Sequence, residues 1–185
     1  MRGLVLAGGK SSRFGSDKAL ARLGGMSLLE KVVSTLDAIN LRPIVVTRRG
    51  IDYSFIQSTL IYDQLPEKGP LGGLYTAMSV FKNTPFLILT CDMPALTPGV
   101  LSGLLASHER CHPVTIYSLE GQGFQPFPGI YEPSLFGMIK EKIKQNDLSM
   151  HGLLEATPAR KVIRWEGDPA VFCNVNYKKD LVFKS

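Results

Sequence analysis

The sequence predicts a doubly wound α/β structure, in which helices cover both faces of a mostly parallel sheet. The first reason is that short apolar, β-branched runs alternate with helical patterns through the first half of the chain. The second is the run "PFLILT" (85–90), which is apolar along most of its length. Such a run indicates a central parallel strand that is covered on both faces.

The first half is expected to alternate strands and helices along the chain. We expect strands at 3–7, 42–47, 59–63 and 85–90, and helices at 27–40, 72–81 and 99–107. Ser27 and Glu30 form a capping-box pattern at the start of the first helix. Thr97 and Pro98 supply an N-cap and a first-turn proline for the third.

The second half is less regular. We expect strands at 113–118, 126–131 and 161–165, and helices at 133–145, 150–156 and 177–183. A glycine-bearing loop, "LEGQGFQ" (119–125), separates the first two of these strands. Since no repeat, low-complexity segment or linker interrupts the 185 residues, we expect a single domain over 1–185.

Composition and charge exclude several classes of protein. The net charge is +5, but the basic residues are scattered, so nucleic-acid binding is disfavoured. The three cysteines form no CxxC pair, which favours a reduced setting without a disulfide framework or zinc site. No run approaches the roughly 18 apolar residues of a membrane span, and the apolar start is too short for a signal peptide. We therefore expect a soluble, cytoplasmic protein with no membrane partner.

The stretch "LVLAGGKSSRFGSDKAL" (4–20) contains Gly-Lys-Ser, the letters that end a Walker P-loop. That motif needs a glycine where this chain has Leu4. The dinucleotide pattern G-x-G-x-x-G also fails, because its second glycine would stand at Lys10. Spacing therefore rejects both of these phosphate-binding loops.

A different phosphate-binding loop is compatible with the same residues. Gly8 and Gly9 follow a strand and allow backbone N–H groups to turn inward as an anion-binding nest. Arg13 and Lys18 suit a triphosphate, which presents several oxygens. The alternative is an ordinary βα loop, with glycines for the turn and solvated basic residues.

Two aspartates follow strand-like runs. Asp92, in "CDMP", stands at the edge of the sheet where the glycine loop is expected. It could cap its loop before Pro94, or it could bind Mg²⁺, which one carboxylate and phosphate oxygens can hold. Asp63 precedes a loop rich in glycine, and its alternative role is that of an ordinary turn aspartate.

The segment "LAGGKSSRFGSDK" (6–18) resembles the signature LAGGxSxRMGxDK of the molybdenum cofactor guanylyltransferases, which are MobA-like nucleotidyltransferases. Phe14 replaces the usual methionine. Three further motifs of this family follow in order, "DQLPEKGPLGGL" (63–74), "LTCDMPAL" (89–96) and "FCNVNYKKDL" (172–181). The resemblance implies a Rossmann-like, three-layer α/β/α domain that transfers GMP from GTP to molybdopterin.

The resemblance also implies roles for particular residues. The catalytic residues would be Arg13, Lys18 and Asp92, with Mg²⁺ held by Asp92. The nucleotide would be bound by Leu6, Ala7, Gly8, Gly9, Lys18, Thr47, Asp63, Gly72 and Asp92. The acceptor would be bound by Gln125, Asn174 and Asn176. Further partners would be molybdoenzymes or their chaperones and other cofactor-biosynthesis proteins.

The two C-terminal asparagines also have a residue-level argument. Asn174 and Asn176 alternate, so they point the same way if the segment is extended. Their amides can donate and accept, which suits the edge of a pterin. The alternative is that Asn176 only caps the helix expected after it.

The nucleotide base is less well determined than the reaction. Related cytidylyltransferases usually read LAAG where this chain has Leu6-Ala7-Gly8-Gly9, which favours GTP. Thr47, however, stands where better-known members carry an asparagine that contacts the nucleotide. The alternatives are a cytidylyltransferase that uses CTP and a non-catalytic carrier of nucleotide or pterin. The presence of Arg13, Lys18 and Asp92 argues against the carrier.

Other residues of chemical interest are expected to be structural. "HERCH" (108–112) has histidines four apart but lacks a partner set for zinc, so we expect a solvated helix end. Cys91 has no neighbouring base and is expected to be a small buried side chain. Trp165 is expected to pack rather than to bind a ligand.

Overall fold

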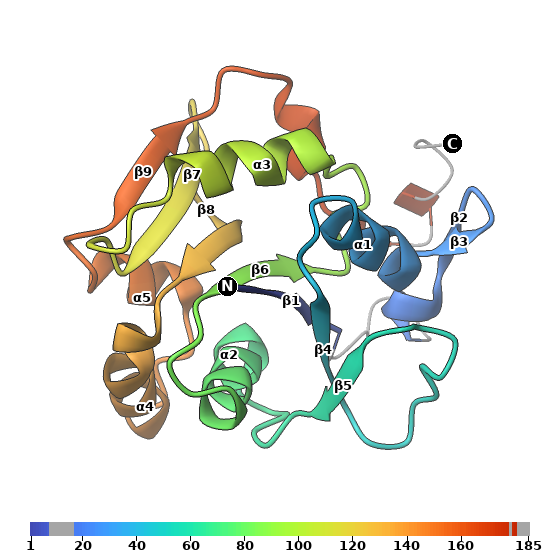
Figure 1. Ribbon diagram of the computed structural model, residues 1–185, viewed down its shortest axis with the longest axis horizontal. Helices are drawn as coiled ribbons and strands as arrows, with labels where there is room; N and C mark the ends of the chain where they lie inside the picture. The colour runs from blue at the N-terminus through green and yellow to red at the C-terminus, as the bar shows by residue number, and fades with distance from the viewer. Residues whose placement is uncertain (8–16, 178, 181–185) are drawn as a thin grey trace.

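A computed structural model describes residues 1–7, 17–177 and 179–180 of the chain (Figure 1). In these residues a seven-stranded sheet has the order β5-β4-β1-β6-β8-β7-β9. Its strands are β1 (Arg2–Leu6), β4 (Pro43–Thr47), β5 (Thr59–Tyr62), β6 (Phe86–Thr90), β7 (Val114–Leu119), β8 (Gly123–Tyr131) and β9 (Lys161–Arg164).

Most neighbouring strands of the sheet are parallel. β1 pairs in parallel with both β4 and β6, and β4 pairs in parallel with β5. β8 is the exception, because it runs antiparallel to both β6 and β7. β9 then pairs in parallel with β7. The predicted mostly parallel sheet is confirmed.

Helices cover both faces of this sheet, which gives the predicted three layers (Figure 1). The helices α1 (Leu28–Asp37) and α3 (Pro98–Ser107) lie on one face. The helices α2 (Gly69–Val80), α4 (Phe136–Lys144) and α5 (Met150–Glu155) lie on the other. Side chains alternate between the two faces along a strand. Val5 of β1 therefore packs in the hydrophobic core beneath α1 and α3, while Leu4 and Leu6 pack in the core beneath α2, α4 and α5.

The expected helix caps are present. The hydroxyl of Ser27 accepts from the N–H of Glu30, and the Glu30 carboxylate accepts from the N–H of Ser27 at 2.6 Å. Thr97 caps α3 through a bond from the Val100 N–H. α2 begins at Gly69 rather than at 72, with Pro70 in its first turn.

Several predicted boundaries were wrong in the second half. The loop expected at 119–125 is shorter, because β7 continues to Leu119 and β8 begins at Gly123. The helix expected at 133–145 divides into a 3₁₀ helix, η2 (Pro133–Leu135), and α4. Most of the expected helix 177–183 lies outside the described residues.

Three short elements were not predicted. A hairpin joins β2 (Arg22–Leu23) to β3 (Met26–Ser27) through glycines at 24 and 25, both with positive φ. The 3₁₀ helix η1 (Lys18–Leu20) precedes this hairpin, and η3 (Pro169–Phe172) precedes the C-terminal segment. Among the described residues, no helix has the length and apolar character needed to cross a bilayer.

Candidate functional site

The order of the strands places a switch point between β1 and β6. From β1 the chain crosses through α1 to β4 on one side, and it later reaches β6 on the other side. In open α/β sheets, ligands bind outside the carboxyl ends of strands at such a point. Ala7 follows β1 and Asp92 lies just beyond β6, so both stand at this edge.

Lys18 and Asp92 meet at the switch point although 74 residues separate them. The Lys18 ammonium donates to Oδ2 of Asp92 at 3.2 Å. The Thr90 hydroxyl, at the end of β6, donates to Oδ1 of Asp92 at 2.5 Å. The two charged side chains are 15% and 25% exposed, respectively, so the pair is partly shielded and still open to a ligand. A cation and a carboxylate in this setting can bind a polyphosphate and a metal ion together.

Lys18 is positioned by residues that the sequence analysis did not single out. Asp17 caps η1, because its Oδ1 accepts from the N–H of Ala19 at 2.9 Å. Its Oδ2 accepts from the hydroxyl of buried Tyr53 at 2.8 Å. Burial and this bond to Asp17 raise the pKa of Tyr53. Asp17 directly before Lys18 was a local sequence signal for the N-cap of η1. No local signal indicated that Tyr53 contacts Asp17.

The C-terminal segment lies against the same pair. The N–H of Val175 donates to the carbonyl of Asp92 at 2.7 Å. Val175 is fully buried, whereas Asn174 and Asn176 on either side are exposed. The amide oxygen of Asn176 accepts from Lys18 at 3.4 Å. The Asp180 carboxylate accepts from the backbone N–H groups of Asn176 and Tyr177, which stabilises the turn that carries Asn176.

Asp63, Thr47 and Gly72 lie near the ends of β4 and β5. The N–H of Asp63 donates to the carbonyl of Thr47 at 2.8 Å. The Asp63 carboxylate accepts from the N–H of Leu65 and from the hydroxyl of Thr76, both at 2.9 Å. A Cβ on Gly72 would lie 2.5 Å from the carbonyl oxygen of Leu65. Asp63 and Gly72 therefore hold the loop between β5 and α2 against α2. This structural role is independent of any contact with a ligand.

Thr47 is the residue that departs from the family pattern. Only 1% of it is exposed, and its hydroxyl lies 3.4 Å from the carbonyl oxygen of Arg48. Its hydroxyl is thus directed toward the main chain at the end of β4.

Of the remaining predicted residues, the structure describes Gln125, Leu6 and Ala7 but not the others. Gln125 lies near the start of β8, and because β8 is antiparallel to β6 this places it at the edge of the sheet that carries Asp92. Leu6 ends β1, and the N–H of Ala7 donates to the carbonyl of Val46 at 2.9 Å. Gly8, Gly9 and Arg13 lie outside the described residues.

Cys91 and Trp165 have the structural roles that were expected. Cys91 is buried, and burial, with the nearby Asp92 carboxylate, raises the pKa of its thiol to about 12. Trp165 packs edge-to-face on Tyr117 and Phe172, with ring centroids 5.2 and 5.3 Å away.

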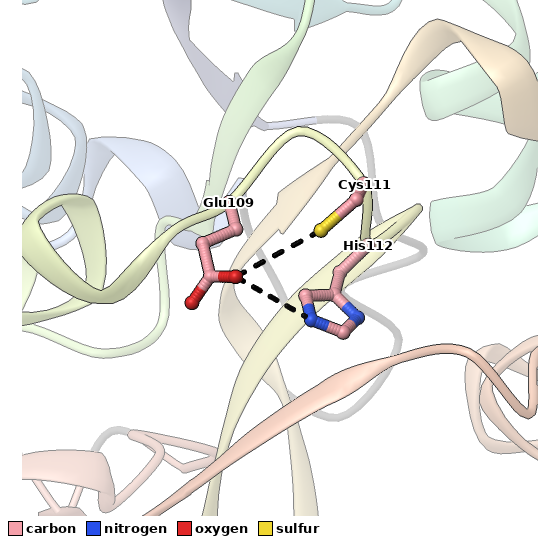
Figure 2. A group of neighbouring side chains, drawn as sticks. All are labelled: Glu109, Cys111 and His112. Carbon is pink, nitrogen blue, oxygen red and sulfur yellow. Dashed lines mark hydrogen bonds and ion pairs between the residues drawn. The ribbon is translucent and has the colours of Figure 1, made fainter.

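The prediction of a solvated helix end for "HERCH" was wrong for His108, whereas Glu109 to Cys111 are exposed just after α3, as expected. His108 is not a solvated residue, since it is buried between Thr115 and Glu132, whose side-chain oxygens lie 2.9 and 2.8 Å from its ring nitrogens. Glu132 lies 24 residues further along the chain, so no local signal revealed this partner. Beyond His108, the side chains of Glu109, Cys111 and His112 gather on the surface and do form a set of possible metal ligands (Figure 2).

Comparisons with known proteins identify the family of this chain. Residues 3–164 match the family model described as "MobA-like NTP transferase domain". A relative from Flavobacterium johnsoniae, named "Probable molybdenum cofactor guanylyltransferase", is 30% identical over 96% of this chain and 92% of its own length. A relative of the same name from Carboxydothermus hydrogenoformans is 34% identical over 75% of this chain and 69% of its own.

Solved structures show the same fold. A protein from Aquifex aeolicus VF5 has a TM-score of 0.79 at 27% identity, over 94% of this chain and 92% of its own. Molybdopterin-guanine dinucleotide biosynthesis protein A from Archaeoglobus fulgidus has a TM-score of 0.77 at 22% identity, over 100% and 96%, which supports the fold alone. On the family match and the identity to its relatives, this chain belongs to the MobA-like NTP transferase family.

Proposed function

We propose that this protein is a nucleotidyltransferase that transfers GMP from GTP to molybdopterin cofactor and releases pyrophosphate. The names of its relatives from Flavobacterium johnsoniae and Carboxydothermus hydrogenoformans support this activity. The observation that carries the proposal is the 3.2 Å contact between Lys18 and Asp92 at the switch point of the sheet. This contact joins Lys18, at the end of the segment 6–18 that resembles the family signature, to Asp92, which lies just beyond the central strand β6.

The reaction explains why the described site needs no nucleophilic side chain. An oxygen of the terminal phosphate of the acceptor forms a bond to the α-phosphorus of GTP. The bond from that phosphorus to the bridging oxygen breaks, and its electron pair leaves with pyrophosphate. A phosphate monoester has a second pKa of about 6, so the attacking oxygen is largely ionised at neutral pH without a strong base. Alignment and charge neutralisation then supply the catalysis.

Asp92 has the chemistry to hold the Mg²⁺ that we propose as the cofactor. Its carboxylate supplies hard oxygen ligands, and Mg²⁺ is commonly bound by one or two carboxylates together with phosphate oxygens and water. The Thr90 hydroxyl orients one carboxylate oxygen, and Lys18 contacts the other. When bound, Mg²⁺ would neutralise negative charge on the reacting phosphates.

The basic side chains bind the part of GTP that leaves. The Lys18 ammonium contacts both Asp92 and Asn176. From this position it would bind the phosphates of GTP. Arg13 is proposed to share this role with a bidentate guanidinium. Together they stabilise the negative charge that develops on pyrophosphate.

The acceptor is proposed to occupy the side of the site that Asn174, Asn176 and Gln125 border. The two asparagines are exposed, and Gln125 lies at the same edge of the sheet. Their amides can pair with the donors and acceptors of a pterin. We further propose that the protein works in the cytoplasm and that its product passes to molybdoenzymes or their chaperones.

A substrate assay tests the function directly. Purified protein is mixed with Mg²⁺ and molybdopterin cofactor, GTP or CTP is added, and pyrophosphate release is followed. We expect release with GTP and a dinucleotide product containing guanine. Release with CTP alone would show a cytidylyltransferase, and binding of GTP without release would show a carrier.

A further inference from the structure

The segment from Glu109 to His112 forms a second polar centre, remote from the first. It connects α3 to β7. β7 is parallel to β6, because both run antiparallel to β8, and Val114 and Phe86 at their starts face the same residue, Tyr131. The segment therefore lies at the amino-terminal edge of the sheet, opposite the edge that carries Asp92. The proposed transfer reaction makes no use of it.

Three different ligand types converge in this segment (Figure 2). The Cys111 sulfur lies 3.8 Å from Oε2 of Glu109. Nε2 of His112 lies 3.9 Å from the same carboxylate oxygen. All three ligand atoms lie within 4.8 Å of one another. A sulfur, a nitrogen and an oxygen thus surround one point from a stretch of four residues.

The imidazole of His112 is held in the form that binds a metal. Its Nδ1 lies 2.8 Å from the carbonyl oxygen of Ala159. Because a carbonyl only accepts, Nδ1 must carry the hydrogen, and in the neutral ring the lone pair is then on Nε2. Nε2 is the atom that faces Glu109. Metal-binding histidines are commonly oriented by such a bond to a backbone carbonyl.

The carboxylate of Glu109 is oriented in a similar way. Lys161, the first residue of β9, hydrogen-bonds and ion-pairs with Oε1, the oxygen that does not face the thiol or the imidazole. Oε2 is the atom that contacts both Cys111 and His112. Ala159, which precedes β9, and Lys161, its first residue, therefore orient two of the three ligands.

We propose that Glu109, Cys111 and His112 bind one Zn²⁺ ion. Thiolate, imidazole and carboxylate together favour zinc over Mg²⁺, which prefers an all-oxygen shell. On ligation a zinc–sulfur bond forms and the Cys111 thiol releases its proton to solvent, with no change of oxidation state. Water completes the tetrahedral shell.

The observed spacing is close to that of a zinc site. Usual zinc–ligand lengths place tetrahedral neighbours about 3.4–3.6 Å apart. The two distances to Oε2 of Glu109, 3.8 and 3.9 Å, exceed this by a few tenths of an ångström, and the Cys111 and His112 ligand atoms, within 4.8 Å of each other, approach by about 1 Å at most. Glu109 and Cys111 are exposed and can make this movement. The bound ion would fix the loop after α3, which Ala159 and Lys161 already contact.

Cobalt is a suitable probe, because Co²⁺ enters zinc sites and a cobalt–thiolate bond absorbs in the near ultraviolet. The metal-free full-length protein is titrated with Co²⁺, with neither nucleotide nor pterin present. We expect a thiolate absorption that saturates at one equivalent and is removed by added Zn²⁺. Cys111→Ser should abolish the absorption, and His112→Gln should weaken Co²⁺ binding at least about tenfold.

Matched variants separate this site from the other thiols and imidazoles. Cys173→Ser replaces another exposed cysteine, and His151→Gln replaces another histidine, so both should leave the titration unchanged. Zn²⁺ should also raise the unfolding temperature of the wild-type protein and not that of Cys111→Ser. An absorption that persists in Cys111→Ser, or that Cys173→Ser removes, would overturn the assignment. So would a titration without any thiolate absorption.

Discussion

Two lysine–aspartate pairs in this protein have similar chemistry and different places in the fold. Lys18 and Asp92 are 74 residues apart, whereas Lys142 and Asp147 are five residues apart. The lysine side chains are almost equally exposed, at 15% and 14%. The two pairs therefore differ in their place in the fold and not in the kind or the burial of the cation.

The Lys142–Asp147 pair serves the end of a helix. Asp147 accepts from Lys142 at 2.6 Å and from the N–H of Ser149, and these bonds lower the pKa of its carboxyl. Its own N–H donates to the carbonyl of Lys142. Both oxygens of the carboxylate are thus used locally, beyond the C-terminus of α4.

The Lys18–Asp92 pair instead joins segments that the topology brings together. η1, the end of β6 and the C-terminal segment all contact it. It stands where open parallel sheets bind ligands. We therefore propose that the switch point of the sheet, and not the presence of an ion pair, marks the site.

Removal of divalent metal should produce the largest effect and should affect only the first pair. With EDTA in excess, we expect pyrophosphate release from GTP to stop, because nothing would then neutralise the reacting phosphates beside Asp92. Excess Mg²⁺ should restore it, and zinc should not. The same recovery is expected for Cys111→Ser, which separates this effect from the proposed zinc site. Full turnover in EDTA would contradict the metal assignment.

Exchange of each lysine for an apolar side chain of similar length sharpens the comparison. Lys18→Met should lower kcat/KM for GTP by about 10²-fold, the cost of removing one charge aimed at the leaving group. Lys142→Met should leave kcat/KM unchanged. Steady-state kinetics on both variants measures the difference, and equal losses would show that position is unimportant.

Tyr53→Phe tests how the first pair is positioned. The variant removes the hydroxyl that donates to Asp17. We expect the free energy of unfolding to fall by about 1 kcal/mol. We also expect a decrease in kcat well below the unfolding temperature, because Asp17 holds η1 and with it Lys18. A loss of stability with kcat unchanged would show that Tyr53 has only a structural role.

Ser27→Ala should have the smallest effect and should not distinguish the pairs. The variant removes one half of the capping box of α1. We expect a loss of about 1 kcal/mol in urea unfolding and no change in kcat/KM. A change in kcat/KM would mean that α1 contributes to the site beyond its packing.

The sequence was sufficient for the parts of the fold that depend on local pattern. Alternating apolar runs predicted the parallel strands, and Ser27 and Thr97 predicted the starts of α1 and α3. The hairpin at 22–27 was missed although Gly24-Gly25 is a recognised hairpin turn, because its strands are only two residues long. Short strands give no periodic signal.

Residues of the candidate site that stand in a sequence motif were predictable. Residues that only a long-range contact identifies were not. Asp92 and Lys18 stand in motifs, and the structure brings them together. The hydroxyl of Tyr53 and the burial of His108 depend on partners 36 and 24 residues away, respectively. Only the fold brings such partners into contact. Glu109 was overlooked as a ligand because an exposed acidic residue in a loop is ordinary.

Exchange of each aspartate for asparagine, followed by measurement of pyrophosphate release from GTP, tests the central claim most directly. Asn keeps the shape of the side chain and removes the charge. We predict that Asp92→Asn lowers kcat by at least about 10²-fold, and that Asp147→Asn leaves it unchanged. Normal turnover by a folded Asp92→Asn variant would contradict the assignment of the switch point as the catalytic site.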